Sequence, residues 1–141
     1  MQTRITIVRR NDIPAISEVE EGGEVHPLGE LRDFRRHPQL AEFIPDQARL
    51  SIAWVRLRAG EELPPHIHPT ASLLLCTAGS GIVLGAPDDI IGPGDAVLVY
   101  AGSTHGFRGL DPTGIEGLSI QFEERGLYED PSRPRVHFMP R

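Results

Sequence analysis

The sequence contains only one cysteine, Cys76, so no disulfide can form within the chain. It also lacks long apolar runs. No stretch approaches the length of a membrane span, and residues 1–12 do not contain the apolar segment of a signal peptide. We therefore expect a cytoplasmic protein that does not enter a membrane.

The sequence has fewer basic than acidic residues. The chain has 14 basic and 20 acidic residues, which gives a formal net charge of -6 when histidine is neutral. This balance argues against a general nucleic-acid binder and against adhesion to anionic membranes. The acidic residues are scattered along the chain, which is typical of an ordinary charged surface.

No segment shows the periodicity of a long helix. Instead, short apolar runs recur at intervals of about ten residues from Leu50 onward, and turns rich in glycine and proline separate them. This pattern predicts an all-β sandwich or barrel. The length of 141 residues fits one domain, and a hydrophobic content of 39% is enough for a modest core.

The N-terminal third of the chain has a less regular pattern. Residues 3–9 (TRITIVR) alternate apolar and polar side chains, which predicts a strand. Residues 11–47 are interrupted by Gly22-Gly23 and by two His-Pro pairs, so we expect an irregular segment there. Within it, residues 31–43 fit a short helix or a strand.

Two of the six histidines, His66 and His68, are separated by one residue. On a strand such residues point to the same face, so the two imidazoles form half of a metal site. A third ligand has to come from elsewhere in the fold. His105 is the best candidate, because it follows a turn and begins another expected strand.

The spacing around this pair resembles the first sequence motif of the cupin superfamily. That motif is a glycine, five residues, His-X-His, three or four residues, a glutamate, six residues and a glycine. The corresponding residues here are Gly60, His66, His68, Ser72 and Gly79. The one departure is Ser72, which stands where the family usually has a glutamate ligand.

The second cupin motif follows in register. Its usual form is a glycine, five residues, a proline, one residue, a glycine, two residues, a histidine, three residues and an asparagine. The corresponding residues here are Gly94, Tyr100, Gly102, His105 and Gly109. The tyrosine and the last glycine replace the proline and the asparagine, which affects turn rigidity but not the histidine.

The resemblance implies a double-stranded β-helix, the jelly-roll or cupin barrel, with a short irregular N-terminal segment. Residues 1–141 would form one cupin domain with a core at about 50–123, an N-terminal strand and arm at 1–49 and a tail at 124–141. Because cupins commonly pair through their sheets, we expect a homodimer, in which the strand at 3–9 extends a neighbour's sheet.

The resemblance also implies that His66, His68 and His105 are metal ligands. Three neutral imidazoles suit Fe(II), Zn, Ni or Cu and leave one side of the metal open. The metal's dipositive charge would stay uncompensated, which favours an anionic, bidentate small-molecule substrate. With Ser72 in place of a glutamate, iron or zinc is favoured over manganese. Fe(II) is the expected cofactor, with Zn, Ni or Mn as alternatives.

Three classes of function remain open, because a fold does not fix a function. The first is a non-haem Fe(II) oxygenase, of dioxygenase type, acting on a chelating small molecule. The second is a Lewis-acid enzyme with Zn, Ni or Mn that catalyses isomerisation, cyclisation or elimination. The third is a non-catalytic domain that binds a small molecule or serves as an accessory module.

Two residues are candidates for catalytic roles beside the metal. Ser72 would either donate a hydrogen bond near the ligands or simply fill the position of the lost fourth ligand. Gln121 would orient the substrate or replace that ligand. Glu123 shares a strand face with Gln121 and is the alternative to it. We expect Trp54, Cys76 and Tyr100 to be packing residues. His26, His37 and His137 are expected to be ordinary surface or core residues.

Overall fold

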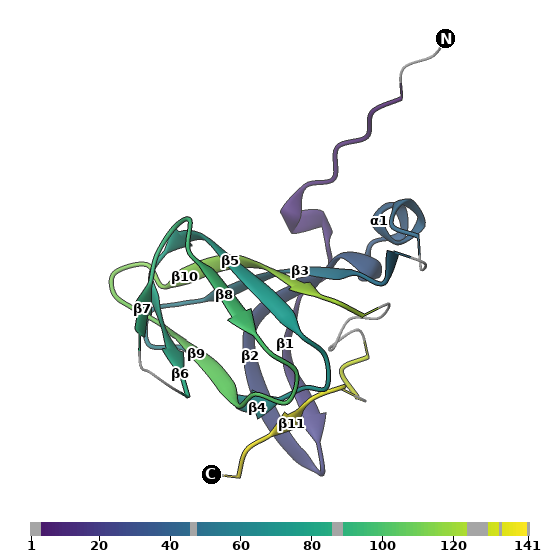
Figure 1. Ribbon diagram of the computed structural model, residues 1–141. Coiled ribbons are helices and arrows are strands. Elements are labelled where there is room, and N and C mark those ends of the chain that lie inside the picture. The colour runs from purple at the N-terminus through teal and green to yellow at the C-terminus, as the bar shows by residue number, and fades with distance from the viewer. Residues whose placement is uncertain (1–3, 46–47, 86–88, 124–129, 133, 141) are drawn as a thin grey trace.

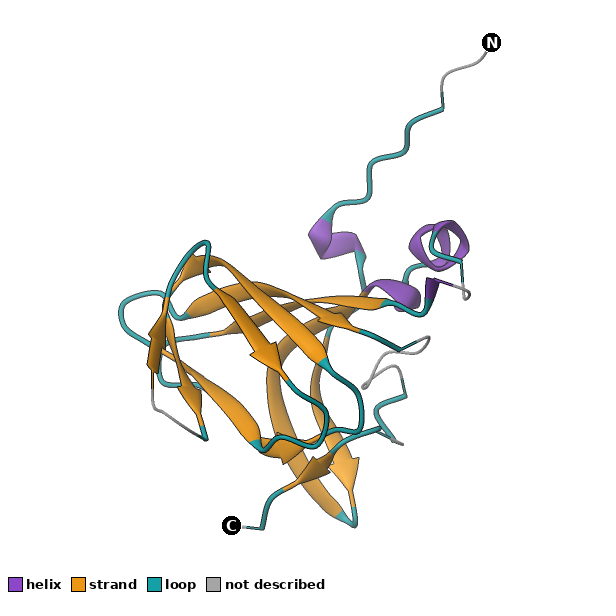
Figure 2. Cartoon of the chain, in the orientation of Figure 1, coloured by secondary structure: helices purple, strands orange, loops and turns teal. Residues whose placement is uncertain are grey.

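The computed structural model describes residues 4–45, 48–85, 89–123, 130–132 and 134–140. Within them, two antiparallel sheets face each other, and short helical segments lie beside one end of the larger sheet (Figures 1 and 2). The all-β barrel expected from the sequence is confirmed. No helix among these residues combines the length and the apolar character needed to cross a membrane.

The larger sheet has six strands among the described residues, in the order β1-β2-β3-β10-β5-β8. Their bounds are β1 (Ile16–Glu21), β2 (Glu24–Asp33), β3 (Ser51–Leu57), β10 (Ile115–Gln121), β5 (Ser72–Gly79) and β8 (Ala96–Val99). The smaller sheet comprises β11 (His137–Phe138), β4 (Glu62–Ile67), β9 (His105–Gly109), β6 (Gly81–Leu84) and β7 (Asp89–Ile91), in that order. The helical segments are η1 (Arg10–Asp12), η2 (Phe34–Arg36) and α1 (Pro38–Phe43).

Strand β5 shows how the sequence places one face of each strand in the core. Ser72, Leu74 and Cys76 are buried, whereas Leu73 and Leu75 between them are half-buried on the outer face. This alternation follows from the period of two along a strand. Buried side chains from both sheets form one core cluster, which includes Leu28, Leu31, Leu57, Leu63, Leu74, Phe107, Ile115 and Val136.

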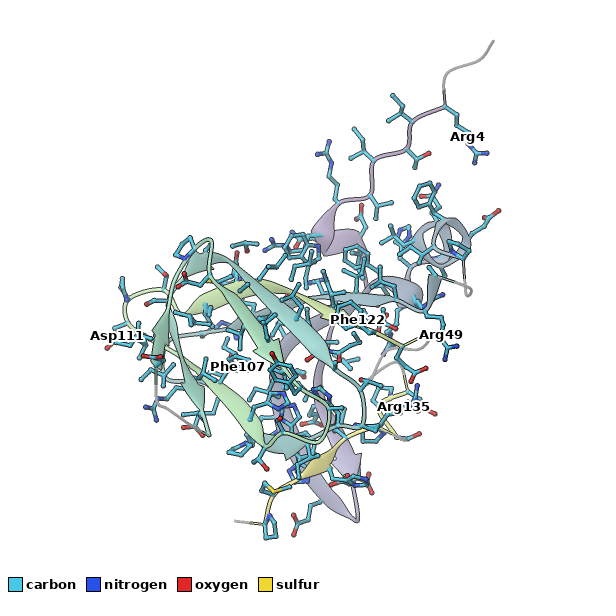
Figure 3. The ribbon with its side chains drawn as sticks, in the orientation of Figure 1. Arg4, Arg49, Phe107, Asp111, Phe122 and Arg135 are labelled. Atoms are coloured by element: carbon cyan, nitrogen blue, oxygen red, sulfur yellow. The ribbon has the colours of Figure 1, made fainter. Side chains whose placement is uncertain are left out.

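The strand predicted at residues 3–9 is wrong. Residues 4–9 form no strand, Thr3 lies outside the described residues, and the segment runs away from the body as an extended arm (Figure 1). Arg4, labelled in Figure 3, lies on this arm. Ile5 and Ile7 are exposed, so their alternation does not reflect a buried face. A strand also needs a neighbour to satisfy its backbone groups, which a local pattern cannot reveal.

The segment at 11–47 is more regular than its pattern indicated, because it contains β1 and β2. Gly22 and Gly23, with φ of 60° and 83°, form the hairpin turn between these two strands and do not end the regular structure. Residues 31–43, which fitted a helix or a strand, contain the end of β2, then η2 and α1. Of the C-terminal tail, residues 124–129 lie outside the described residues.

Candidate metal centre

Strands β4 and β9 are neighbours and carry the three histidines of interest. The register pairs His66 directly with His105, and His68 follows just after the end of β4. All three side chains are buried, and one nitrogen from each lies within 4.8 Å of the others. Tertiary structure therefore brings together the three residues that the spacing singled out. His105 reaches the other two through strand pairing, which makes residues distant in sequence adjacent.

Each of these imidazoles is held by its Nδ1 atom. The acceptor is a backbone carbonyl two residues away: Pro64 for His66 at 2.8 Å, Thr70 for His68 at 2.7 Å and Ser103 for His105 at 2.9 Å. A carbonyl oxygen only accepts hydrogen bonds, so Nδ1 carries the proton in each ring. The Nε2 lone pairs remain available to a metal, in rings whose orientation is already fixed.

The environment also keeps these rings uncharged. Burial lowers the pKa of His66 to about 3 and the pKa of His105 to about 4, and it lowers the pKa of His68 as well. For His66 and His105, repulsion from a neighbouring ring adds to this effect. Since a metal binds the neutral imidazole, protons do not compete with it near neutral pH.

The histidines line a cavity of about 50 Å³ between the two sheets. Its walls are mainly apolar and are formed by Leu31, Val55, Leu57, Leu63, Leu74, Val99, Phe107 and Ile115, of which Phe107 is labelled in Figure 3. Apart from the histidines, its polar side chains are those of Ser72, Ser119 and Gln121. No lysine, arginine, aspartate or glutamate from the described part of the chain lines this cavity.

The two residues proposed for catalytic roles lie side by side on the larger sheet. Ser72 on β5 pairs with Gln121 on β10, and both line the cavity. The Gln121 Nε2 atom donates a 2.9 Å hydrogen bond to the Ser119 hydroxyl. Ser119 was not anticipated from the sequence, although it lies two residues before Gln121 and therefore shares its strand face.

Glu123 does not line the cavity, although it was expected to share a face with Gln121. Strand β10 ends at Gln121, and the Glu123 carboxylate lies 3.3 Å from the Arg135 guanidinium. Beyond the end of a strand, the alternation of faces no longer holds. Gln121, and not Glu123, therefore joins Ser119 in the wall of the cavity.

The other histidines have roles outside the cavity. His26 stacks on Phe138, with ring centroids 4.0 Å apart, and His37 caps α1 by accepting from the Gln39 amide. His137 is exposed and lies 3.2 Å from the Glu21 carboxylate.

The remaining residues of interest also lie outside the cavity. Cys76 is buried in the core and Trp54 packs beneath Arg10. The packing role predicted for Tyr100 is wrong, because its side chain is exposed.

The donor set is chemically suited to a divalent metal. Three neutral nitrogens converge, each ring is oriented by a carbonyl, and no carboxylate joins the cluster within the described residues. Such a set is suited to Fe, Zn, Ni or Cu and leaves coordination positions for water or a ligand. The site could therefore hold one divalent metal, and His66, His68 and His105 would be its protein ligands.

Comparison with solved structures places the fold among known proteins. The polyketide cyclase RemF from Streptomyces resistomycificus aligns over 97% of this chain and 87% of its own, with a TM-score of 0.69 and 19% identity. A predicted oxalate decarboxylase from Thermotoga maritima aligns over 84% of this chain and 99% of its own, with a TM-score of 0.61 and 19% identity. At these identities the similarity demonstrates a shared fold and no shared reaction.

A third structure, the DMSP lyase DddQ from Ruegeria pomeroyi, is 32% identical over 55% of this chain, with a TM-score of 0.48. The aligned part spans 38% of that lyase. No curated protein matches the sequence. The model of the AraC-like ligand binding domain matches residues 51–131, which is more than half of the chain and includes every candidate ligand. The chain thus has the cupin fold of these structures, and it belongs to the family of AraC-like ligand binding domains.

Proposed function

We propose that this chain is a mononuclear metalloenzyme that holds one divalent metal through the Nε2 atoms of His66, His68 and His105. The observation that carries this proposal is the geometry of the three rings. All three are buried, neutral and tethered through Nδ1, and they meet at a single cavity. A purely structural metal site is usually closed by a fourth protein ligand. Here the described residues supply three.

Fe(II) is the metal we favour, and a dioxygenase-type oxidation is the reaction. When bound, iron would supply a Lewis acid and an electron source at positions that the protein leaves open. The protein's own part is to hold and shield the reactants. The histidines would hold the metal, the apolar walls would limit access of water, and Ser72 and Gln121 would present hydrogen-bonding groups to the bound molecule.

The cavity also supports a proposal about the substrate. Because no basic side chain from the described residues lines it, the metal would be the main positive charge inside. A small molecule that chelates through an anionic or polarised oxygen pair would therefore bind at the metal, with its apolar part against the aliphatic walls.

Two other functions have specific support. The structural similarity to a polyketide cyclase extends over nearly the whole chain, which favours Lewis-acid chemistry with Zn, Ni or Mn as the second candidate. The match to a family of ligand binding domains favours the third candidate, a non-catalytic module that binds a small molecule.

Elemental analysis of protein purified without added metal separates these candidates. We expect close to one iron per chain, and oxygen consumption when small diketones, thiols or catecholic acids are added. Zinc at the same stoichiometry, with turnover that persists without oxygen, would favour the Lewis-acid enzyme. A metal that binds without any turnover would favour the ligand-binding module. An empty site that no divalent metal can fill would contradict both enzyme candidates.

We also propose that the chain forms a homodimer through the outer face of the larger sheet. Two cross-strand rows on this face are apolar: Ile52, Ile120, Leu73 and Leu98 in one, and Trp54, Leu118, Leu75 and Ala96 in the other. An exposed sheet face is normally polar, and a contiguous apolar patch marks an interaction surface. The arm with Ile5 and Ile7 leads into Arg10, which lies over Trp54, and its two isoleucines are exposed to a second copy.

Replacing Leu98 with aspartate is expected to convert a dimer to a monomer, because it places a charge in the apolar interface. Light scattering coupled to gel filtration would show the mass falling by half. Ile90→Asp is the matched control, since Ile90 is 69% exposed and Leu98 is 64% exposed, but Ile90 lies on β7 of the other sheet. A wild-type protein that is monomeric at all concentrations tested would contradict the proposal.

A further inference from the structure

The side-chain oxygen of Gln121 lies in the wall of the cavity and has no hydrogen-bond donor among the described residues. The Oε1 atom of Gln121 is buried, and no described residue donates to it. The opposite end of the same amide is occupied, because Nε2 donates to the Ser119 hydroxyl at 2.9 Å. In this orientation of the amide the oxygen is left as an unpaired acceptor. A buried acceptor without a donor is unfavourable, so a molecule in the cavity that donates a hydrogen bond to this oxygen would be bound more tightly.

The surroundings of Gln121 restrict which partner it can have. Ser72 is its direct neighbour on β5, and the Ser72 side chain lines the same cavity. These two side chains belong to the larger sheet, whereas the histidines are carried by β4, β9 and the residue after β4. The cavity therefore has two polar regions, with nitrogens on one sheet and an amide and a hydroxyl on the other.

The charge of the cavity wall restricts the partner further. A carboxylate or phosphate would find no basic side chain among the described residues that line the cavity, and a carboxylate would face the lone pairs of the Gln121 oxygen. An ammonium group would find no carboxylate from the described residues there. An uncharged hydroxyl or N–H group would satisfy Oε1 without leaving an unpaired charge buried.

We propose that Gln121, assisted by Ser72, determines specificity by accepting a hydrogen bond from an uncharged hydroxyl or N–H of the substrate. The substrate is then a small, mostly apolar molecule with a metal-chelating oxygen pair and, away from it, a neutral hydrogen-bond donor. This inference rests on the proposed function, because the chelating pair requires the metal. It adds that the substrate group near Gln121 is uncharged and donates a hydrogen bond to it.

Three hydroxamates that share one chelating group test this selectivity. Glycolohydroxamate ends in a hydroxyl, methoxyacetohydroxamate in an ether, and the monohydroxamate of oxalic acid in a carboxylate. Calorimetry with zinc-loaded protein is expected to show that the hydroxyl probe binds about tenfold more tightly than the ether, because the ether leaves Oε1 unpaired. The carboxylate probe should bind more weakly than the hydroxyl probe.

Variants of Gln121 identify the group responsible. Gln121→Leu removes the acceptor and should reduce the preference for hydroxyl over ether to near one. Gln121→Glu keeps an acceptor and should retain the preference. Thr77→Val on the outer face of β5 is the matched control and should behave like wild type, because Thr77 does not line the cavity. A preference that survives in Gln121→Leu would overturn the proposal, as would equal affinities, or tighter binding of the ether, in the wild type.

A measurement on the metal-free protein tests the role of Gln121 independently of the proposed metalloenzyme function. The Gln121 side-chain amide resonances of the metal-free protein can be followed while 1,2-propanediol or 1,2-dimethoxyethane is added. We expect them to shift with the diol and not with the diether. Identical responses to both would overturn the inference even if the metal site is real. Failure to load zinc would instead contradict the proposed function, whatever the resonances show.

Discussion

Replacing His66 with alanine is expected to abolish stoichiometric metal binding. His66 is one of the three converging ligands, and its ring centroid lies 4.3 Å from that of His105 and 5.8 Å from that of His68. Removing only a hydrogen-bond partner of a metal ligand typically weakens binding by about 10- to 100-fold. The loss of one of three ligands should exceed this range. Competition with a chromogenic chelator would measure the change in zinc affinity.

The control for this prediction is His137→Ala. His137 also lies on a strand of the smaller sheet, but its side chain is exposed and pairs with Glu21 outside the cavity. This variant should bind metal as the wild type does. Wild-type affinity in the His66→Ala protein would show that the metal binds elsewhere and would contradict the assignment. Unfolding curves of both variants without metal would show whether either change acts through stability.

Gly114→Ala is expected to destabilise the fold severely, although Gly114 lies outside the metal centre. Gly114 precedes β10 and has φ of 78°, which favours glycine. A Cβ atom there would lie 2.7 Å from the carbonyl carbon of Arg58 and still closer to the carbonyl oxygen of Leu57. Since both contacts are backbone, neither can rotate away. We expect a loss of about 4 kcal/mol in the free energy of unfolding, at the upper end for a point mutation.

Gly60→Ala separates the two expected causes of the destabilisation, which are the unfavourable positive φ and the clash of the added Cβ atom with backbone. Gly60 has φ of 81°, but a Cβ atom there would meet nothing within 4 Å. This variant therefore carries only the conformational penalty, for which we expect about 1 kcal/mol. Urea unfolding of the metal-free proteins would measure both losses. Equal losses in the two variants would show that the close approach of Leu57 and Arg58 does not matter.

The consequence of Gly114→Ala for the site follows from the position of β10. This strand starts at Ile115 and ends at Gln121, so it carries Ser119 and Gln121 and pairs with β5, which carries Ser72. Displacing its start would disturb the wall of the cavity that faces the histidines. The three ligands themselves are on or directly after strands of the other sheet. We therefore expect any folded fraction of this variant to keep its metal.

The success and failure of sequence reasoning along this chain have physical causes. The pair His66 and His68 was identifiable because a strand places residues two apart on one face, and this property is local. The prediction of a strand at residues 3–9 was wrong, because apolar and polar side chains alternate there in the same way whether or not a neighbouring strand exists. Sequence reasoning also missed the strands on either side of Gly22-Gly23, because a hairpin turn and a break in regular structure have the same composition.

By itself, the sequence determined the all-β class, the position of most strands after Leu50, and the three histidines together with Ser72 in place of a glutamate. Only the tertiary structure decided which polar groups reach the cavity. It placed Gln121 beside Ser72 and paired Glu123 with Arg135 outside, and it oriented each imidazole through a carbonyl. These outcomes depend on cross-strand register and on the facing of two sheets. Both join residues far apart in the chain, so no local pattern encodes them.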